Sequence, residues 1–249
     1  MVHDTCDTYQ NTATSGLTEE TNLGVGKSVI NTNSTRFKYA SPDVITQIYK
    51  LLYIIDKIFT ENEIEFWMDG GTFLGAIRHK GIIPHDDDGD IQVWDHDEEL
   101  IKSLQPELAK YNIILKPIWF GYKLYFNDAA SIKGYDWKYP AIDIFPVKAV
   151  NNKLIYSYPK AQETWSKCYH DLETLFPLKQ YKFGSFTLPG ASERSVKTYM
   201  DRCYGSDWST HAYQQFDHQN EKMIDNKVKI KLTSKELEPA QPIDFNRDF

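Results

Sequence analysis

The sequence predicts an α+β fold in which helices flank a mixed β-sheet, and three observations support this class. Apolar residues recur at helical spacing over residues 42–61, as in an amphipathic helix. Residues 88–94 and 141–147 have the alternating or apolar patterns of β-strands. Strand and helix patterns do not alternate regularly along the chain, which disfavours a doubly wound parallel sheet.

The first helix is expected at about residues 42–61. Ser41 suits its N-cap, Pro42 its first position and Asp43 the positive end of its dipole. Its apolar stripe is best explained by packing in the core. Further strands are expected at residues 65–68, 113–115 and 122–126, with helices at residues 72–78 and 98–110. From residue 160 to Gly205 the pattern is mostly helical, so we expect a mostly helical C-terminal part.

Three segments are expected along the chain. Residues 1–40 are rich in Thr, Asn, Ser and Gly and have weak periodicity, as in a flexible N-terminal arm. Residues 41–210 carry the strand and helix patterns of one folded domain. Residues 211–249 form a polar C-terminal tail that packs on this domain or extends from it, with a short strand at residues 228–232.

Composition and charge exclude several classes of protein. The 249 residues are enough to bury a sizeable core. With 28 Lys and Arg against 35 Asp and Glu, the net charge is −7, which disfavours nucleic-acid polymers and anionic membranes as partners. No apolar stretch reaches the roughly 18 residues of a membrane span, and no signal-peptide pattern is visible. We therefore expect a cytoplasmic protein.

The three cysteines, Cys6, Cys168 and Cys203, are far apart in the sequence. An odd and sparse set of this kind does not indicate a disulfide framework. No CxxC pair suggests a zinc site.

The acidic run from Asp86 to Asp90 is the first candidate functional element. Residues two apart on a strand share a face about 6–7 Å apart, so Asp88 and Asp90 would present their carboxylates side by side. Like charges at this separation favour binding of a divalent cation, and oxygen ligands favour Mg²⁺ or Mn²⁺. Taken alone, the run is more typical of a solvated acidic turn.

Gly70, Gly71 and Thr72 form the second candidate element. A strand that ends in two glycines and a hydroxyl before a helix provides backbone N–H groups that bind phosphate. Glycine pairs are also common in ordinary turns, so this pattern is weak alone. Combined with the acidic run, it favours phosphoryl or nucleotidyl transfer assisted by metal ions.

Asp143 is a third acid, inside the apolar stretch at residues 141–147. A carboxylate in such a strand is costly to bury unless it is paired or binds a metal. It is expected to be a third metal ligand, or a base that takes a proton from an attacking hydroxyl. The alternatives are an outward-facing residue and a local salt bridge.

These elements resemble the motifs of the LicD family, whose nucleotidyltransferase-like core is shared by fukutin and fukutin-related protein. Residues 71–84 with the following aspartates resemble its long first motif, residues 142–146 its second and residues 204–208 its C-terminal motif. The resemblance covers about residues 42–210. It implies a polymerase-beta-type nucleotidyltransferase fold and a catalytic domain at residues 41–210. It also implies transfer of a phospho-alcohol, of the phosphocholine or ribitol or glycerol phosphate type, from a CDP-activated donor to a glycan hydroxyl.

The family motifs also imply roles for individual residues. Asp88 and Asp90 match the metal-binding pair, and Asp143 matches the third acid. Gly70, Gly71 and Thr72 match the phosphate-binding turn, and Arg78 matches a basic residue near the donor phosphates. Lys80 and Lys123 are candidates to neutralise the pyrophosphate, although most lysines are simply solvated.

Two residues depart from the family pattern: His85 stands where Trp is common, and Gly89 where Ile or Val is common. Glycine between the acids is expected to remove an apolar contact and loosen the strand.

Three other activities stay open. The same acids would serve transfer of a whole nucleotide to a small molecule or protein, or a metal-dependent phosphodiesterase. An inactive member would bind nucleotide or glycan without reaction. The expected partners are a CDP-linked donor and a glycan or glycoconjugate acceptor, and the sequence predicts no oligomeric state.

Overall fold

Residues 37–242 are described by the computed structural model of the protein. By its contacts the chain divides into residues 1–36 and residues 37–249. The flexible arm expected at residues 1–40 therefore lies almost entirely outside the described residues. No helix within the described range is long and apolar enough to cross a bilayer.

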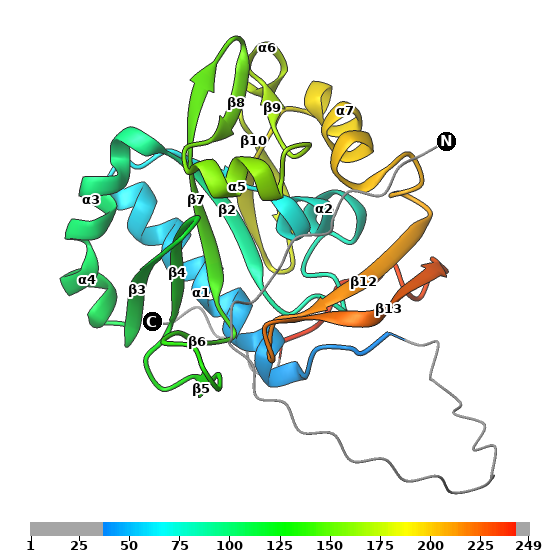
Figure 1. The fold of residues 1–249 in the computed structure, drawn as a ribbon, viewed down its shortest axis with the longest axis horizontal. Coiled ribbons are helices and arrows are strands. Elements are labelled where there is room, and N and C mark those ends of the chain that lie inside the picture. Colours follow the sequence, from blue (N-terminus) through cyan, green and yellow to red (C-terminus); the bar gives the residue numbers. More distant parts are fainter. Residues whose placement is uncertain (1–36, 243–249) are drawn as a thin grey trace, which may run out of the picture. The chain divides into compact units, whose positions relative to one another are not determined.

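A mixed β-sheet organises the second unit (Figure 1). Its main path has the order β1–β2–β7–β4–β3, and β8 and β9 extend it from β7. Strands β2 and β7 run parallel, whereas the other neighbouring strands of the sheet run antiparallel. The predicted α+β class with a mixed sheet is thus confirmed. The strands are β1 (Phe66–Met68), β2 (Gly89–Trp94), β3 (Ile113–Ile118), β4 (Gly121–Phe126), β7 (Ile142–Val150), β8 (Lys153–Tyr156) and β9 (His170–Asp171).

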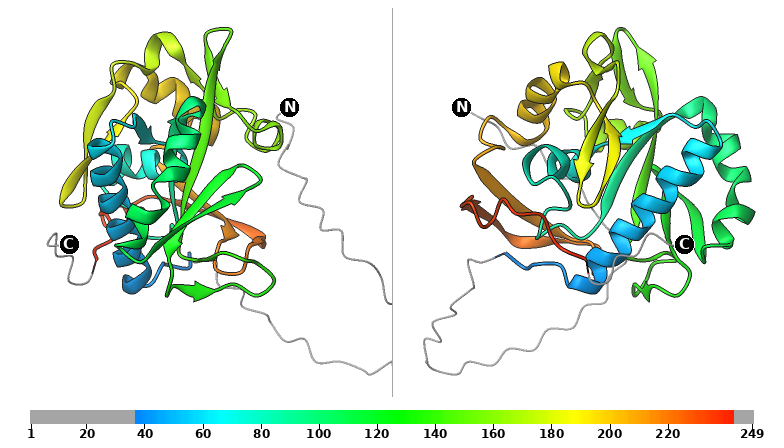
Figure 2. Two further views of the ribbon diagram at one scale, coloured as in Figure 1. Left: turned by 90° about the vertical axis from the view of Figure 1, so that its left-hand side faces the viewer. Right: turned by 180° about the vertical axis from the view of Figure 1, so that it is seen from behind.

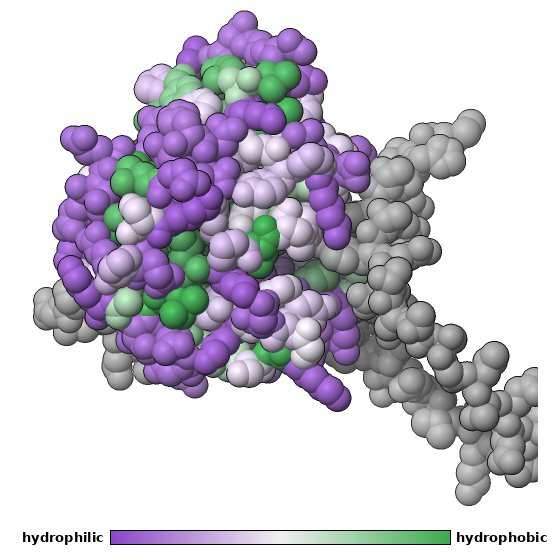
Figure 3. Space-filling view, turned by 60° about the vertical axis from the view of Figure 1, so that its left-hand side comes forward, coloured by the Kyte–Doolittle hydropathy of each residue, from purple (hydrophilic) through white to green (hydrophobic). Residues whose placement is uncertain are grey.

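Helix α1 (Pro42–Glu61) packs across one face of this sheet, where it contacts β4 and β7 (Figure 2). It begins as expected, since the Ser41 hydroxyl accepts a hydrogen bond from the Val44 N–H and Pro42 occupies its first turn. Its apolar stripe lies in the core, where Leu52 and Ile55 are fully buried. Polar residues cover most of the face seen in Figure 3, with apolar residues in small separate groups.

The helix expected at residues 98–110 consists of two short helices, α3 (Glu98–Ser103) and α4 (Gln105–Ala109). Pro106 lies in the first turn of α4, where its missing N–H costs no helical hydrogen bond. In one continuous helix this N–H would bond to the Lys102 carbonyl, so its absence favours the break, which falls at Leu104. The remaining helices are α2 (Gly70–Arg78), the 3₁₀ turn at Asp95–Asp97, α5 (Pro159–Thr164), α6 (Leu172–Leu175) and α7 (Glu193–Tyr204).

The C-terminal part contains more β-structure than expected. Beside α5, α6 and α7 it has two antiparallel hairpins, β10 (Lys179–Phe183) with β11 (Phe186–Gly190), and β12 (His211–Asp217) with β13 (Lys222–Lys231). In the first hairpin, buried Tyr181 and Phe183 alternate with exposed residues, a period of two that the mostly helical interpretation overlooked. The short strands β5 (Ala130–Ser131) and β6 (Lys138–Tyr139) pair with each other.

The second hairpin lies where a polar tail with one short strand at residues 228–232 was expected, and that strand forms the end of β13. Ala212 is the buried residue of β12, so the strand has little apolar signal. Polar contacts hold the hairpin instead: Gln214 donates to the carbonyls of Lys38 and His85.

Candidate active site

Three aspartates meet at the start of the parallel pair β2 and β7. The register of these strands places Asp90 beside Asp143, and Asp88 lies directly before β2. Carboxylate oxygens of all three lie within 4.8 Å of one another. The structure thus brings together the three acids that the sequence singled out, in an arrangement that can hold a metal ion.

Charge repulsion and burial act together on this cluster. Burial raises the pKa of Asp88 and Asp90 well above the usual range, and neighbouring carboxylates raise it further. For the same two reasons the pKa of Asp86 rises to about 7. Buried carboxylates this close together are stabilised either by protonation or by binding a cation.

Lys123 on β4 supplies one positive charge. Its ammonium nitrogen lies 2.8 Å from Asp143 Oδ1, and both side chains are buried. Burial opposes the lysine charge, but Asp143 and Glu221 outweigh this effect and raise the pKa of Lys123. The local salt bridge expected as one alternative for Asp143 is therefore present, at the same position as the acidic cluster.

The glycine turn lies directly against the aspartates. The Gly71 N–H donates to Asp90 Oδ2 at 2.9 Å, and the Thr72 hydroxyl accepts from the Asp90 N–H at 2.7 Å. A Cβ on Gly70 would lie 2.5 Å from Asp90 Oδ2, and one on Gly71 would lie 2.4 Å from Asp86 Oδ2. Gly70 also has a φ of +49°, a conformation that favours glycine. A side chain at either position would have to displace one of these carboxylates or the start of α2.

Arg78 and Lys80 bond to backbone carbonyls in this structure. Arg78 Nη1 donates to the carbonyls of Trp208 and His211, and so holds the segment that leads into β12. Burial lowers the pKa of Arg78 to about 10, although nearby Asp86 opposes the shift. Lys80 is exposed and its Nζ donates to the Ile77 carbonyl at 2.9 Å. Their roles toward phosphate stay predictions.

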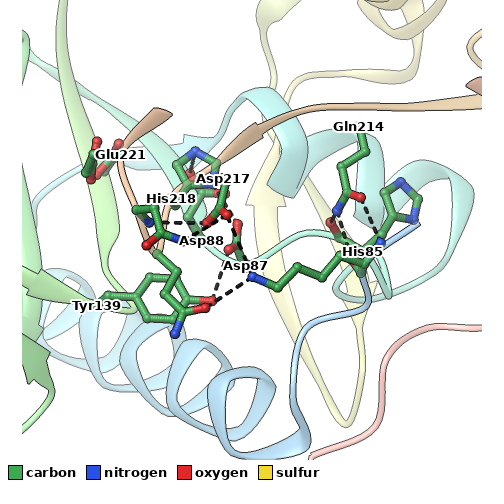
Figure 4. A network of polar contacts seen from close by, with 12 residues as sticks. His85, Asp87, Asp88, Tyr139, Gln214, Asp217, His218 and Glu221 are labelled. Atoms are coloured by element: carbon green, nitrogen blue, oxygen red, sulfur yellow. Dashed lines mark hydrogen bonds and ion pairs between the residues drawn. The ribbon is translucent and has the colours of Figure 1, made fainter. Parts of the chain in front are cut away.

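The tip of the β12–β13 hairpin enters the site, which the sequence did not predict (Figure 4). His218 Nδ1 lies 2.6 Å from Asp87 Oδ1, and its Nε2 lies 3.0 Å from Asp88 Oδ2. Burial alone would lower the pKa of His218, but Asp88 and Asp87 raise it to about 10. The imidazolium is thus a counter-charge to the acidic cluster. Asp87, Asp88 and His218 form a second group whose ligand atoms lie within 4.8 Å of one another.

Two further side chains surround this tip. Glu221 of the hairpin turn accepts a hydrogen bond from Trp137 Nε1 at 2.9 Å and lies 4.0 Å from Lys123 Nζ. The Tyr139 hydroxyl donates to Asp87 Oδ2 at 3.0 Å. No local signal marks these contacts, because they join segments far apart in the sequence.

A buried polar network supports the glycine turn from behind. Asp69, directly before the turn, is buried and accepts hydrogen bonds from Gln92 Nε2 at 2.8 Å and Tyr156 OH at 2.9 Å. Tyr199 OH of α7 also donates to Asp69 and accepts from the Gly70 N–H. His170 stacks on the Tyr199 ring with 4.0 Å between centroids. The network joins β1, β2, β8 and α7 at one carboxylate.

The two departures from the family pattern have local explanations. A Cβ on Gly89 would lie 2.6 Å from Ile142 Cδ1, so Ile142 already fills this space, contrary to the expected loss of an apolar contact. The His85 ring packs on Phe37 with 4.2 Å between centroids. Burial lowers the pKa of His85 to about 3, so the ring is neutral.

Comparisons with known proteins match the part of the chain that carries the aspartates. The family model described as "LicD/FKTN/FKRP, nucleotidyltransferase domain" matches residues 63–190. These residues include the glycine turn and all three acids, whereas the β12–β13 hairpin lies beyond them.

Similar proteins come from several bacteria. The uncharacterized protein RP689 of Rickettsia prowazekii is 32% identical over 200 residues, which are 79% of this chain and 69% of that protein. The uncharacterized protein RT0683 of Rickettsia typhi is 30% identical, and the match covers 78% of this chain and 58% of that protein. Lipopolysaccharide cholinephosphotransferase LicD of Haemophilus influenzae is 32% identical over 111 residues, 39% of this chain and 40% of that protein.

Among solved structures, the lincomycin-bound lincosamide antibiotic adenylyltransferase LnuA has a TM-score of 0.33 and 17% sequence identity. The superposition covers 57% of this chain and 79% of that one.

Proposed function

Because this chain belongs to the LicD family, we propose that it is a metal-dependent phosphotransferase that moves a phospho-alcohol from a CDP-activated donor to a glycan hydroxyl. The observation that carries the proposal is the meeting of Asp88, Asp90 and Asp143 beside the glycine turn. We expect the phospho-alcohol to be of the phosphocholine, ribitol phosphate or glycerol phosphate type. A cytoplasmic location also stays a prediction.

The cluster fits a divalent cation of the Mg²⁺ or Mn²⁺ kind. Its three acids offer oxygen ligands within 4.8 Å of one another, and such hard ligands suit these ions. The raised pKa of Asp88 and Asp90 marks buried negative charge that a cation would stabilise. When bound, the ion would neutralise donor phosphate charge and polarise the bond that breaks.

The chain's own residues would position the two reactants. Gly70, Gly71 and Thr72 form the start of α2, whose dipole favours phosphate. The Gly70 and Gly71 N–H groups donate to Tyr199 and Asp90 in this structure, so they would bind phosphate only after a change in these hydrogen bonds. Asp143, held by Lys123 at 2.8 Å, would accept the proton of the attacking hydroxyl. The new bond joins this oxygen to the phosphorus of the phospho-alcohol, while the bond to CMP breaks and CMP leaves. Arg78 and Lys80 would approach the donor phosphates only after a change in their present hydrogen bonds.

The test is transfer from CDP-choline to a glycan acceptor by the purified chain with Mn²⁺, followed by mass spectrometry of the products. Asp88→Asn and Asp90→Asn should reduce CMP release at least 100-fold, with circular dichroism and thermal unfolding like wild type. Asp97→Asn, on the 3₁₀ turn before α3, is the matched control and should keep full activity. Turnover near wild type in either site variant would refute the assignment.

Whole-nucleotide transfer is the second candidate, because the matched family domain is described as a nucleotidyltransferase domain. The two reactions differ in where CMP goes. A phosphotransferase releases CMP and adds the phospho-alcohol to the acceptor, whereas a nucleotidyltransferase adds CMP to the acceptor and releases the alcohol phosphate. An inactive binding protein would bind CDP-choline equally with and without Mn²⁺ and release nothing.

A further inference from the structure

The imidazole ring of His218 lies between two carboxylates at the tip of the β12–β13 hairpin (Figure 4). Its Nδ1 lies 2.6 Å from Asp87 Oδ1, and its Nε2 lies 3.0 Å from Asp88 Oδ2. Asp88 is one of the three acids proposed above to hold a cation, whereas Asp87 is not. One ring nitrogen therefore contacts a carboxylate outside the proposed cation site, and the other contacts a proposed ligand.

This arrangement matches the usual surroundings of a histidine that binds a metal. Such a histidine donates one ring N–H to a carboxylate, which fixes the tautomer and the orientation of the ring, and it binds the metal through the other nitrogen. Here Asp87 holds Nδ1 of His218, and the Tyr139 hydroxyl in turn donates to Asp87 Oδ2 at 3.0 Å. Nε2, the nitrogen beside Asp88, is then the one that would bind a metal.

The spacing of the polar atoms also suits one ion. Bonds from Mg²⁺ or Zn²⁺ to oxygen or nitrogen are about 2.0–2.2 Å long, so ligands at right angles lie about 3 Å apart. The separation of His218 Nε2 and Asp88 Oδ2 is 3.0 Å. Asp88 belongs to both groups of residues whose ligand atoms lie within 4.8 Å of one another. A simple ion pair has the same spacing, so the choice between the two depends on what happens when a cation arrives.

A cation at Asp88 and a proton on Nε2 compensate the same negative charge, and both together are costly in a buried site. Two outcomes are open when the ion binds. In the first, the protonated ring of His218 moves away together with the hairpin. In the second, the ring stays, its Nε2 proton leaves to solvent, and Nε2 binds the ion.

Contacts that do not involve Asp88 favour the second outcome, because they hold the ring and the hairpin in place. Asp87 holds Nδ1 of the ring. Gln214 of β12 donates to two backbone carbonyls outside the hairpin. Glu221 of the hairpin turn accepts a hydrogen bond from Trp137 Nε1 at 2.9 Å. A cation between Asp88 and Nε2 breaks none of these bonds, so the ring stays beside it.

We infer that His218 is a ligand, through Nε2, of the cation that Asp88 binds, and that Asp87 positions its ring. The inference deepens the proposed function and rests on it for the presence of a cation at Asp88. It also predicts the kind of ion, because an imidazole nitrogen favours first-row transition ions such as Mn²⁺ over Mg²⁺. His218 lies beyond residues 63–190, so this ligand comes from outside the part of the chain that matches the family model.

The experiment is Mn²⁺ binding by the purified chain without donor or acceptor, measured by calorimetry and by pulsed electron paramagnetic resonance. Mn²⁺ bound to the wild type should show the hyperfine coupling of a directly bound imidazole nitrogen, and His218→Gln should lose it. Mn²⁺ affinity should fall roughly tenfold or more in His218→Gln, and the preference for Mn²⁺ over Mg²⁺ should shrink. Asp87→Asn should weaken Mn²⁺ binding about tenfold but keep the nitrogen coupling.

His211→Gln is the matched control in the same hairpin. The His211 ring lies 3.7 Å from Asp207 Oδ2, so this variant also removes an imidazole that faces a carboxylate. It should keep both the wild-type Mn²⁺ affinity and the nitrogen coupling. The wild-type spectrum itself tests the inference even if a variant fails to fold.

Two results would overturn the inference directly. One is bound Mn²⁺ without nitrogen coupling in the wild type. The other is Mn²⁺ binding by His218→Gln that is as tight as in the wild type or tighter, which is the result expected if the ion displaces an imidazolium. Absence of Mn²⁺ binding to the wild type would also overturn it.

The CMP-release assay described above separates this inference from the proposed function. CMP release without nitrogen coupling overturns the role of His218 and leaves the phosphotransferase intact. Nitrogen coupling without CMP release supports His218 as a ligand and counts against the phosphotransferase.

Discussion

Replacing Tyr199 with Phe removes one hydroxyl from the network behind the glycine turn. That hydroxyl donates to the buried carboxylate of Asp69 and accepts from the Gly70 N–H at 3.3 Å. Burial and the nearby Asp69 both raise the pKa of Tyr199 well above its usual value. The hydroxyl therefore stays protonated, and can donate, at every pH at which the protein is folded. The substitution keeps the ring and its stacking on His170.

The expected loss follows from the two broken contacts. A hydrogen bond to a charged group contributes about 1.5–3 kcal/mol, and a buried N–H left without a partner costs about 1–3 kcal/mol. Because Gln92 and Tyr156 still donate to Asp69, we expect the low end of the combined range, about 2.5 kcal/mol. For a domain of this size, that lowers the melting temperature by roughly 5–10 °C.

The assay is urea and thermal unfolding of Tyr199→Phe beside Tyr181→Phe. Tyr181 is also buried, but its hydroxyl donates to a single neutral group, the Ala191 carbonyl, so its loss should cost about 1 kcal/mol. Tyr199→Phe should also lower kcat for transfer, because the released Gly70 N–H loosens the start of α2. Equal destabilisation by the two variants would refute the idea that Tyr199 couples Asp69 to the turn.

Three further predictions concern cation binding, the turn and pH. Saturating Mn²⁺ at about 100 times its Kd should stabilise the protein by about 2.7 kcal/mol in thermal unfolding; Asp90→Asn should lose this gain while raising the stability of the metal-free protein, because it removes buried repulsion. Gly71→Ala should abolish transfer in the CMP-release assay while the fold survives, since its Cβ would lie 2.4 Å from Asp86 Oδ2; wild-type rates would contradict the tight approach. Burial lowers the pKa of His79 to about 4, so the unfolded chain binds a proton below pH 6.5 that the folded chain refuses. Carboxylates such as Asp86, whose pKa is raised to about 7, titrate in the same range with the opposite effect, so the contribution of His79 is measured as a difference between variants. In urea titrations His79→Gln should gain up to about 3 kcal/mol relative to wild type as the pH falls from 6.5 to 4, and a constant difference would contradict the prediction.

Short sequence patterns predicted the features that depend only on neighbouring residues. Ser41 and Pro42 mark the start of α1 because capping chemistry acts within one turn. Asp88 and Asp90 were paired from strand periodicity alone, and the glycine turn was recognised from three adjacent residues. Joining Asp143 to them required the register of β2 with β7, which no short-range pattern contains. The cost of burying a lone carboxylate pointed to Asp143 as a third ligand, and the family resemblance supported that link.

The β12–β13 hairpin shows where such reasoning stops. A strand is recognised by the side chains it buries, and Ala212 is the buried residue of β12. The hairpin is instead held by polar contacts, such as those of Arg78 and Gln214 with distant carbonyls. Many polar side chains can donate to a backbone carbonyl, so the sequence does not indicate which residues are partners, whereas the structure does. His218 was missed for this reason.

The charges of the site come from two parts of the chain, one inside and one beyond the residues that match the family model. The carboxylates of Asp88, Asp90 and Asp143 lie within the residues that match the family model, as does Lys123. The imidazolium of His218 comes from the hairpin beyond them. A divalent cation at Asp88 would repel that imidazolium, because like charges a few ångströms apart are costly in a buried site. Cation occupancy and hairpin position therefore depend on each other.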